Sequence, residues 1–103
     1  MEIVHLSERR YRRWRARLSE QDRQHVGRRL QLLERHGVEL GMPNVRRLFS
    51  GVWEVRVPTG VRMYFTIFEG DIVFVDYGNK DTQSRNMSRA LQRAQELHDA
   101  DRP

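Results

Sequence analysis

The stretch WEVRVPTGVRMYFTI, residues 53–67, decides the fold that the sequence predicts. On both sides of its central PTG, apolar residues alternate with polar ones, which is the period of a strand that buries one face. Pro58–Gly60 has the length and composition of a three-residue hairpin loop. The stretch therefore predicts two antiparallel strands, 53–57 and 61–67, joined by a tight turn.

This hairpin sets two arginines against each other. Arg56 is expected directly opposite Arg62, and Glu54 opposite Tyr64. Like charges that face each other across two strands destabilise a sheet, unless an anion lies between them or acids lie nearby. Because Glu54 is also a diagonal neighbour of Arg62, the pattern leaves two interpretations open. One is an anion-binding site, and the other is a solvated, partly compensated face of the sheet.

Helix and strand signals elsewhere complete the architecture. The expected elements are a strand over residues 2–6, two antiparallel helices within 7–36, a strand over 45–49, a strand over 72–75 and a helix over 81–98. The strands are grouped apart from the helices, which favours the α+β class. We expect an N-terminal strand and helical hairpin packed on a small, mostly antiparallel sheet, with a C-terminal helix.

Single residues set the expected boundaries of these elements. Ser7 and Ser19 are suited to cap the first two helices, and Gly37 to end the second. The strand at 72–75 is apolar on both faces, as in the centre of a sheet. Gly78 is expected to break its pattern before the last helix.

Length and composition exclude several classes of protein. The 103 residues fit one domain, 1–103. The absence of cysteine excludes disulfides, cysteine-ligated zinc, iron–sulfur clusters and thiol nucleophiles. The four histidines have no ligand spacing, so we expect no metal. We also expect no cofactor. No apolar run approaches the ~20 residues that span a bilayer, and no signal-peptide pattern begins the chain. These features predict a cytoplasmic protein without a membrane association.

The charge is basic and uneven. The formal net charge is +5 at pH 7, and its excess lies in the N-terminal half, which favours a polyanionic or acidic partner. Six arginines stand on the first expected helix: Arg9, Arg10, Arg12, Arg13, Arg15 and Arg17. A charge run on a helix is usually a solvated face, although phosphate contacts with RNA or DNA require the same residues.

A second candidate site is GNKDTQ, residues 78–83, which contains Lys80, the only lysine of the chain. This segment places a lysine between the end of a strand and the start of a helix, where backbone N–H groups favour anions. Its spacing is that of neither a Walker loop nor a dinucleotide fingerprint. The simpler interpretation makes Asp81 or Thr82 the helix cap and Lys80 a solvated cation.

Three segments in order resemble a known family. They are LFSGVWEVRV at 48–57, GVRMYF at 60–65, and GNKDTQ at 78–83 with Ala90 after it. Together they are similar to the RelE/ParE superfamily of type II toxin–antitoxin toxins. Within it they most resemble the HigB-like, phage-associated branch of addiction-module killer proteins. The likeness covers most of the chain.

The resemblance implies a compact α+β toxin that enters the ribosomal A site and cuts mRNA. It also implies a cognate antitoxin, often of the helix-turn-helix DNA-binding type. Carried over by motif, the catalytic cations are Arg56, Arg62 and Lys80. The expected RNA contacts are Tyr64, Thr82, Gln83, Arg46 and Arg47.

Two other functions remain open from the sequence. A ParE-like gyrase inhibitor shares the fold and acts by binding protein rather than by cutting RNA. A non-catalytic or decayed toxin would act as a basic binding module. All three readings share the expected fold and differ in what the basic residues contact.

Overall fold

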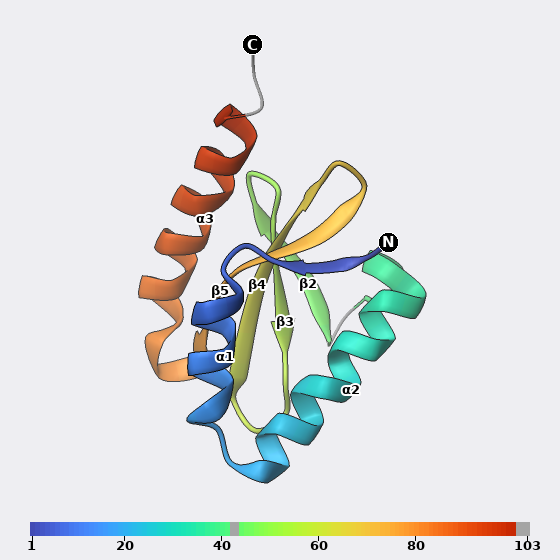
Figure 1. Ribbon diagram of the computed structural model, residues 1–103, viewed down its shortest axis with the longest axis vertical. Coiled ribbons are helices and arrows are strands. Elements are labelled where there is room, and N and C mark those ends of the chain that lie inside the picture. The colour runs from blue at the N-terminus through green and yellow to red at the C-terminus, as the bar shows by residue number, and fades with distance from the viewer. Residues whose placement is uncertain (42–43, 101–103) are drawn as a thin grey trace.

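The computed structural model describes residues 1–41 and 44–100. Its elements follow the expected order, with two short 3-10 helices in addition (Figure 1). They are β1 (Ile3–His5), α1 (Glu8–Ala16), α2 (Glu20–His36), η1 (Gly37–Leu40), β2 (Val45–Phe49), β3 (Val52–Arg56), β4 (Val61–Phe68), β5 (Asp71–Asn79), η2 (Lys80–Thr82) and α3 (Gln83–Ala100). The predicted α+β class is confirmed.

The five strands form one sheet in the order β1-β5-β4-β3-β2. β1 pairs with β5 in parallel, and the other three pairs are antiparallel, so the sheet is mostly antiparallel as expected. Helices cover both faces (Figure 1). The α1 and α2 side buries one hydrophobic cluster, which includes Val26, Leu33 and Phe65. The α3 side buries a second cluster, which includes Tyr64 and Ala90.

The hairpin has the predicted register. Arg56 pairs with Arg62, and Glu54 pairs with Tyr64. Because side chains alternate across a strand, all four point to the α3 side of the sheet. The helix caps are also as predicted: the Ser7 hydroxyl accepts a hydrogen bond from the Arg10 backbone, and Ser19 accepts one from Asp22.

The strand β5 corrects the sequence prediction. It runs through Gly78 to Asn79 rather than ending near residue 75, and it lies second in the sheet, with β4 in the centre. A β-carbon at Gly78 would overlap the Asn86 side chain of α3. The glycine therefore permits close approach of helix and strand, which is a second use of glycine inside strands.

The start of the last helix differs as well. Asn79, rather than Asp81 or Thr82, is the cap: its side chain accepts hydrogen bonds from the backbone N–H groups of both later residues. The Thr82 hydroxyl accepts a hydrogen bond from the Asn79 backbone, which completes a capping box. The turn η2 precedes α3, which begins at Gln83.

In the part of the chain that the structure describes, no helix is long and apolar enough to cross a membrane.

Candidate functional site

The three cations predicted as catalytic line one pocket. Arg56 from β3, Arg62 from β4 and Lys80 from η2 border a cavity of about 280 Å³ beside the loop that joins β3 to β4. The other lining residues are Arg29, Asn44, Val57, Pro58, Thr59 and Gly60. The hairpin and the GNKDTQ segment, distant in sequence, therefore form a common site.

The pocket is strongly cationic. Arg29 of α2 adds a fourth positive side chain to the three predicted ones, and none of the described lining residues is acidic. Four cations around so small a volume form a site for an anion rather than for a cation or an apolar group. The contacts of the nearest acid, Glu54, distinguish between the two interpretations of the arginine pair.

Glu54 is fully buried and forms an ion pair with Arg56. The Arg56 Nε donates a hydrogen bond of 2.8 Å to Glu54 Oε1, and the Gln83 amide donates one of 2.7 Å to Oε2. Arg46 on β2 lies 3.7 Å from Oε1. Glu54 thus fixes the Arg56 guanidinium by one edge, and leaves its other N–H groups for a ligand.

Arg62 is not compensated in this way. Its Nη1 donates a hydrogen bond of 3.2 Å to the Val61 carbonyl, and its Nε is buried without a hydrogen-bond partner. It forms no ion pair with any carboxylate in residues 1–41 and 44–100. Glu54 therefore does not neutralise the charge of its diagonal neighbour Arg62, which the sequence had left open. This favours the interpretation as an anion-binding site.

Lys80 reaches the pocket through a backbone contact between the two motifs. Its N–H donates a hydrogen bond of 2.9 Å to the carbonyl of Gly60. Gly60 has φ 105°, a left-handed conformation that favours glycine. The exposed lysine side chain passes beside this glycine, so the hairpin loop positions it.

The predicted RNA contacts have different places. Gln83 holds Glu54, and Thr82 caps the turn that carries Lys80, so both position other groups. Arg46 lies beside Glu54 on the same face of the sheet as Arg56. Arg47 points to the opposite face, where its guanidinium lies 5.9 Å from the centre of the Trp53 ring. Of these residues, none lines the pocket itself.

Tyr64 is fully buried in the cluster beneath α3. Burial and the neighbouring charge of Glu54 raise the pKa of its phenol, so the hydroxyl stays protonated. The ring has no accessible face on which an RNA base could stack. A direct RNA contact by Tyr64 is therefore not what the structure supports, and packing beneath the helix is its role here.

Sequence reasoning missed Arg29. Its Nε donates a hydrogen bond of 3.3 Å to the Arg56 carbonyl, which brings α2 to the pocket. Nothing in the periodicity of α2 separates Arg29 from the neighbouring Arg28, which is exposed and outside the pocket. Only the packing of the helix on the sheet distinguishes them.

Glu54 should also leave a signature in the dependence of stability on pH. Burial alone would raise its pKa, but the hydrogen bonds from Arg56 and Gln83 outweigh burial and hold the pKa below the ordinary value of 4.5. The stabilisation is therefore fully present above about pH 4.5 and is lost as the pH falls through the lower, folded-state pKa. Glu54→Gln removes this pH-dependent stabilisation.

We expect urea unfolding from about pH 7 to about pH 3 to show a free-energy advantage of the wild type over Glu54→Gln that shrinks on acidification. Gln24→Ala, an exchange of an exposed and uncharged side chain on α2, is the control and should show a difference from the wild type that stays constant with pH. An advantage that stays constant down to about pH 3 would contradict the assignment.

Comparisons with known proteins bear on this geometry. Residues 13–99 match the family described as phage-derived protein Gp49-like. No curated protein sequence matches the chain. Among solved structures, the chain is similar to a double arginine-to-alanine mutant of the E. coli toxin RelE in the free state. The TM-score is 0.65 at 17% identity, over 89% of this chain and 95% of that one.

It is also similar to a chain of the YoeB–YefM complex from Staphylococcus aureus. The TM-score is 0.57 at 16% identity, over 75% of this chain and 93% of that one. The chain therefore has the fold of RelE and YoeB, as the three sequence segments predict. The chain belongs to the phage-derived Gp49-like family.

Proposed function

We propose that the protein is the toxin of a type II toxin–antitoxin system and an endoribonuclease that cuts mRNA on the ribosome. The observation that carries this proposal is the pocket in which Arg56, Arg62 and Lys80 meet without an acidic neighbour in its described lining. The likeness to RelE and YoeB supports the toxin class. A site of action on translating ribosomes would place the protein in the cytoplasm.

The pocket fits the charge that develops during RNA cleavage. The 2′-hydroxyl oxygen attacks the adjacent phosphorus and loses its proton to water, and negative charge builds on the oxygens of the phosphorane. The bond to the 5′ oxygen then breaks as that oxygen takes a proton from water. Preorganised donors aimed at that charge accelerate such a reaction. Guanidinium groups are planar, permanently charged and matched to phosphate oxygens. We assign stabilisation of the phosphorane to Arg56 and Arg62.

The supporting residues explain why these two arginines are suited to the task. Glu54 orients Arg56 through its Nε. Arg62 is tied to the hairpin by the Val61 carbonyl and keeps donors without an acidic partner. Lys80 then supplies a further cation at the mouth of the hairpin loop. The described lining holds no carboxylate or imidazole, so charge stabilisation is the contribution that these residues make to catalysis.

The partner we propose is a cognate antitoxin that covers this cationic site, of the helix-turn-helix type that the sequence resemblance implies. The YoeB–YefM structure is a complex of two proteins, which supports a protein partner for this fold. Co-expression with the product of the neighbouring gene should relieve growth inhibition and yield a complex that co-purifies.

The first test adds purified protein to a cell-free translation reaction and follows both protein output and message length. The proposal predicts shortened message and reduced output. Intact message with normal output would contradict it. Inhibition of gyrase with intact message would instead identify a ParE-like inhibitor, and RNA binding alone would identify a binding module.

Arg29 allows a matched test of the pocket. Arg29→Ala removes a cation that lines it, whereas Arg28→Ala removes an exposed arginine one residue earlier on the same helix. We expect Arg29→Ala to lower the rate of message cleavage by about tenfold, less than removal of a phosphorane donor. Arg28→Ala should cleave at the wild-type rate. Equal rates for the two variants would exclude Arg29 from the site.

A further inference from the structure

A second cationic pocket lies at the edge of the sheet. β1 pairs with β5 only over Ile72–Phe74, so the rest of β5 has no strand beside it on that side. The space next to it, between α1 and α3, is a pocket of about 290 Å³. None of the residues predicted as catalytic lines it.

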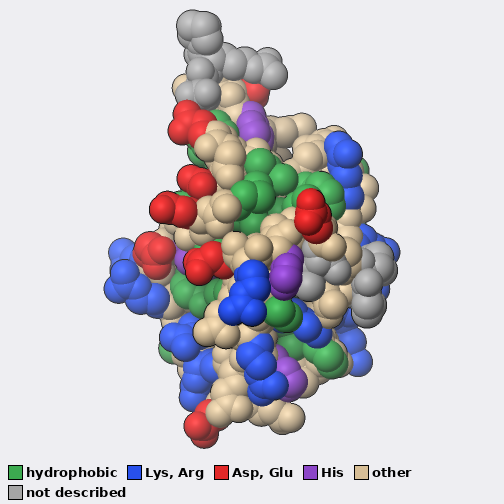
Figure 2. Space-filling view, turned by 90° about the vertical axis from the view of Figure 1, so that its right-hand side faces the viewer, with side chains coloured by type: hydrophobic (Ala, Val, Ile, Leu, Met, Phe, Trp, Pro, Cys, Tyr) green, Lys and Arg blue, Asp and Glu red, His purple; other side chains and the backbone are tan. Residues whose placement is uncertain are grey.

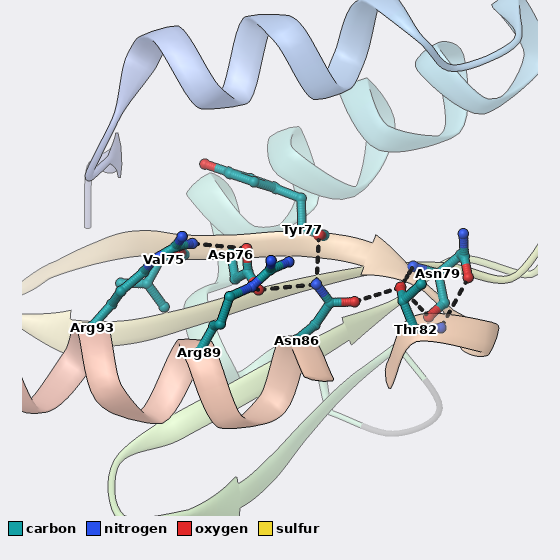
Figure 3. A network of polar contacts seen from close by, with 8 residues as sticks. All are labelled: Val75, Asp76, Tyr77, Asn79, Thr82, Asn86, Arg89 and Arg93. Carbon is teal, nitrogen blue, oxygen red and sulfur yellow. Dashed lines mark hydrogen bonds and ion pairs between the residues drawn. The ribbon is translucent and has the colours of Figure 1, made fainter. Parts of the chain in front are cut away.

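The exposed edge of β5 is closed to strand addition by side chains of α3 (Figure 3). Arg93 Nη1 donates a hydrogen bond of 2.8 Å to the Val75 carbonyl, and Asn86 Nδ2 donates one of 3.0 Å to the Tyr77 carbonyl. A peptide that added itself as a strand would need these acceptors. A ligand in this pocket would therefore contact side chains rather than the backbone of β5.

Five arginines surround this pocket. Arg10 and Arg13 lie on α1 and Arg17 is its C-cap residue, and their intervals of three and four place them on one face of the helix. Arg89 and Arg93 face them from α3. Half of the arginine run on the first helix, which the sequence left as a solvated face or a phosphate-contacting one, is thus directed toward further cations.

The charge of the pocket is not balanced internally. Asp76 is the only acid among its described lining residues. Its Oδ2 accepts hydrogen bonds from Asn86 and Arg89, and its Oδ1 accepts one of 2.8 Å from Arg93. Both carboxylate oxygens are therefore occupied from the α3 side, as Figure 3 shows.

The three α1 arginines are exposed and form no ion pair within residues 1–41 and 44–100. By contrast, the face in Figure 2 carries both acidic and basic side chains around a group of hydrophobic ones. Five guanidinium groups directed at one hollow with one committed carboxylate repel one another, and a bound polyanion relieves that repulsion.

We propose that this pocket binds the phosphate backbone of a nucleic acid. The guanidinium fork matches phosphate oxygens, and two opposed rows of arginines fit a strand that passes between α1 and α3. The chemistry favours a nucleic acid over an acidic protein segment, because the pocket offers little apolar surface to anchor a peptide. The two aromatic residues that line the pocket, Trp14 and Tyr77, stack on each other with ring centres 4.9 Å apart, and Tyr77 is buried, so they leave little ring surface for a peptide.

The second pocket is adjacent to the first. Tyr77 lines the second pocket and Lys80 lines the first. The two residues are three apart in the chain, or about 10 Å along an extended backbone. The inference goes beyond the proposed cleavage, since backbone binding between α1 and α3 requires no chemistry at Arg56 or Arg62.

The test measures binding of a short, fluorescent 2′-O-methyl RNA, which lacks the 2′-hydroxyl and cannot be cut. Each phosphate contact contributes about 0.7 to the slope of log K against log salt for a single strand. We expect the triple variant Arg10→Gln, Arg13→Gln, Arg17→Gln to lower that slope by about 2 and the affinity at low salt at least tenfold.

The matched control is Arg9→Gln, Arg12→Gln, Arg28→Gln, which removes three exposed arginines that line neither cationic pocket. It should shift the slope by much less than the pocket variant. Thermal melts of both variants should match the wild type, since the removed groups form no ion pairs in the described chain. Equal losses in both variants would show an effect of net charge alone and overturn the proposal.

A second probe separates the alternative partner. A poly-glutamate peptide of equal charge should bind more weakly than the RNA, and the pocket variant should weaken its binding no more than the matched control does. Tighter, pocket-dependent binding of the peptide would assign the surface to an acidic protein and overturn the nucleic-acid assignment. Failure of the cleavage proposal would leave the binding result with 2′-O-methyl RNA unchanged.

Discussion

Arg62→Ala is expected to lower the rate of message cleavage by at least about 100-fold, the loss seen when one donor to a developing oxyanion is removed. The reason lies in its surroundings: Arg62 faces Arg56 across the hairpin, lines the cationic pocket and has no acidic partner among the described residues. Induced expression should then no longer arrest growth. Message cleavage in cell-free translation gives the rate.

Two further variants keep this result interpretable. Arg62→Lys preserves the charge but not the planar fork, so its rate should fall between those of the wild type and Arg62→Ala. Arg28→Ala should cleave normally. Circular dichroism must show Arg62→Ala folded, because an unfolded variant would assign Arg62 a structural role. A folded variant that cleaves at the wild-type rate would remove Arg62 from the proposed chemistry.

Gly78→Ala is expected to destabilise the fold by about 3 kcal/mol, at the upper end of the usual cost of overpacking. The added methyl group would overlap the Asn86 and Thr82 side chains where β5 passes beneath the start of α3. Asn86 is buried and bonds to both Asp76 and the Tyr77 carbonyl. A shift there disturbs the network that anchors α3 to the sheet (Figure 3).

Gly27→Ala is the matched control, because a β-carbon there meets no atom within 4 Å. In the middle of α2 the exchange should stabilise the protein by about 1 kcal/mol through helix propensity. Chemical unfolding of the two variants should therefore move in opposite directions from the wild type. A Gly78→Ala variant as stable as the wild type would show that the contact between β5 and α3 is not as tight as described.

The register of the hairpin was predictable to the residue because two local signals agree. A period of two assigns the faces of the strands, and a three-residue loop sets the register that opposes Arg56 and Arg62. The strand alternation also placed Tyr64 on the same face as these arginines. It carried no information on how much of that face α3 covers, and this decides that Tyr64 is buried while Arg62 reaches the pocket.

The departures have a common physical cause, which is contact between distant segments. Gly78 was expected to break the strand because glycine is a local breaker, whereas tight packing of α3 needs glycine within the strand. The place of Arg29 in the first pocket depends on how α2 lies on the sheet. The direction of Arg10, Arg13 and Arg17 toward the second pocket depends in the same way on α1. Arginine in a charged helix gives no periodic signal of that placement.

The central claim, cleavage of translated message by the Arg56, Arg62 and Lys80 pocket, is tested most directly by mapping mRNA 5′ ends in a cell-free translation reaction. The same message should be supplied with and without its start codon, together with purified wild-type protein or Arg62→Ala. The account predicts new 5′ ends at fixed positions within codons, only on the translated message and only with the wild type. Uncut translated message, or equal cutting by Arg62→Ala, would contradict it.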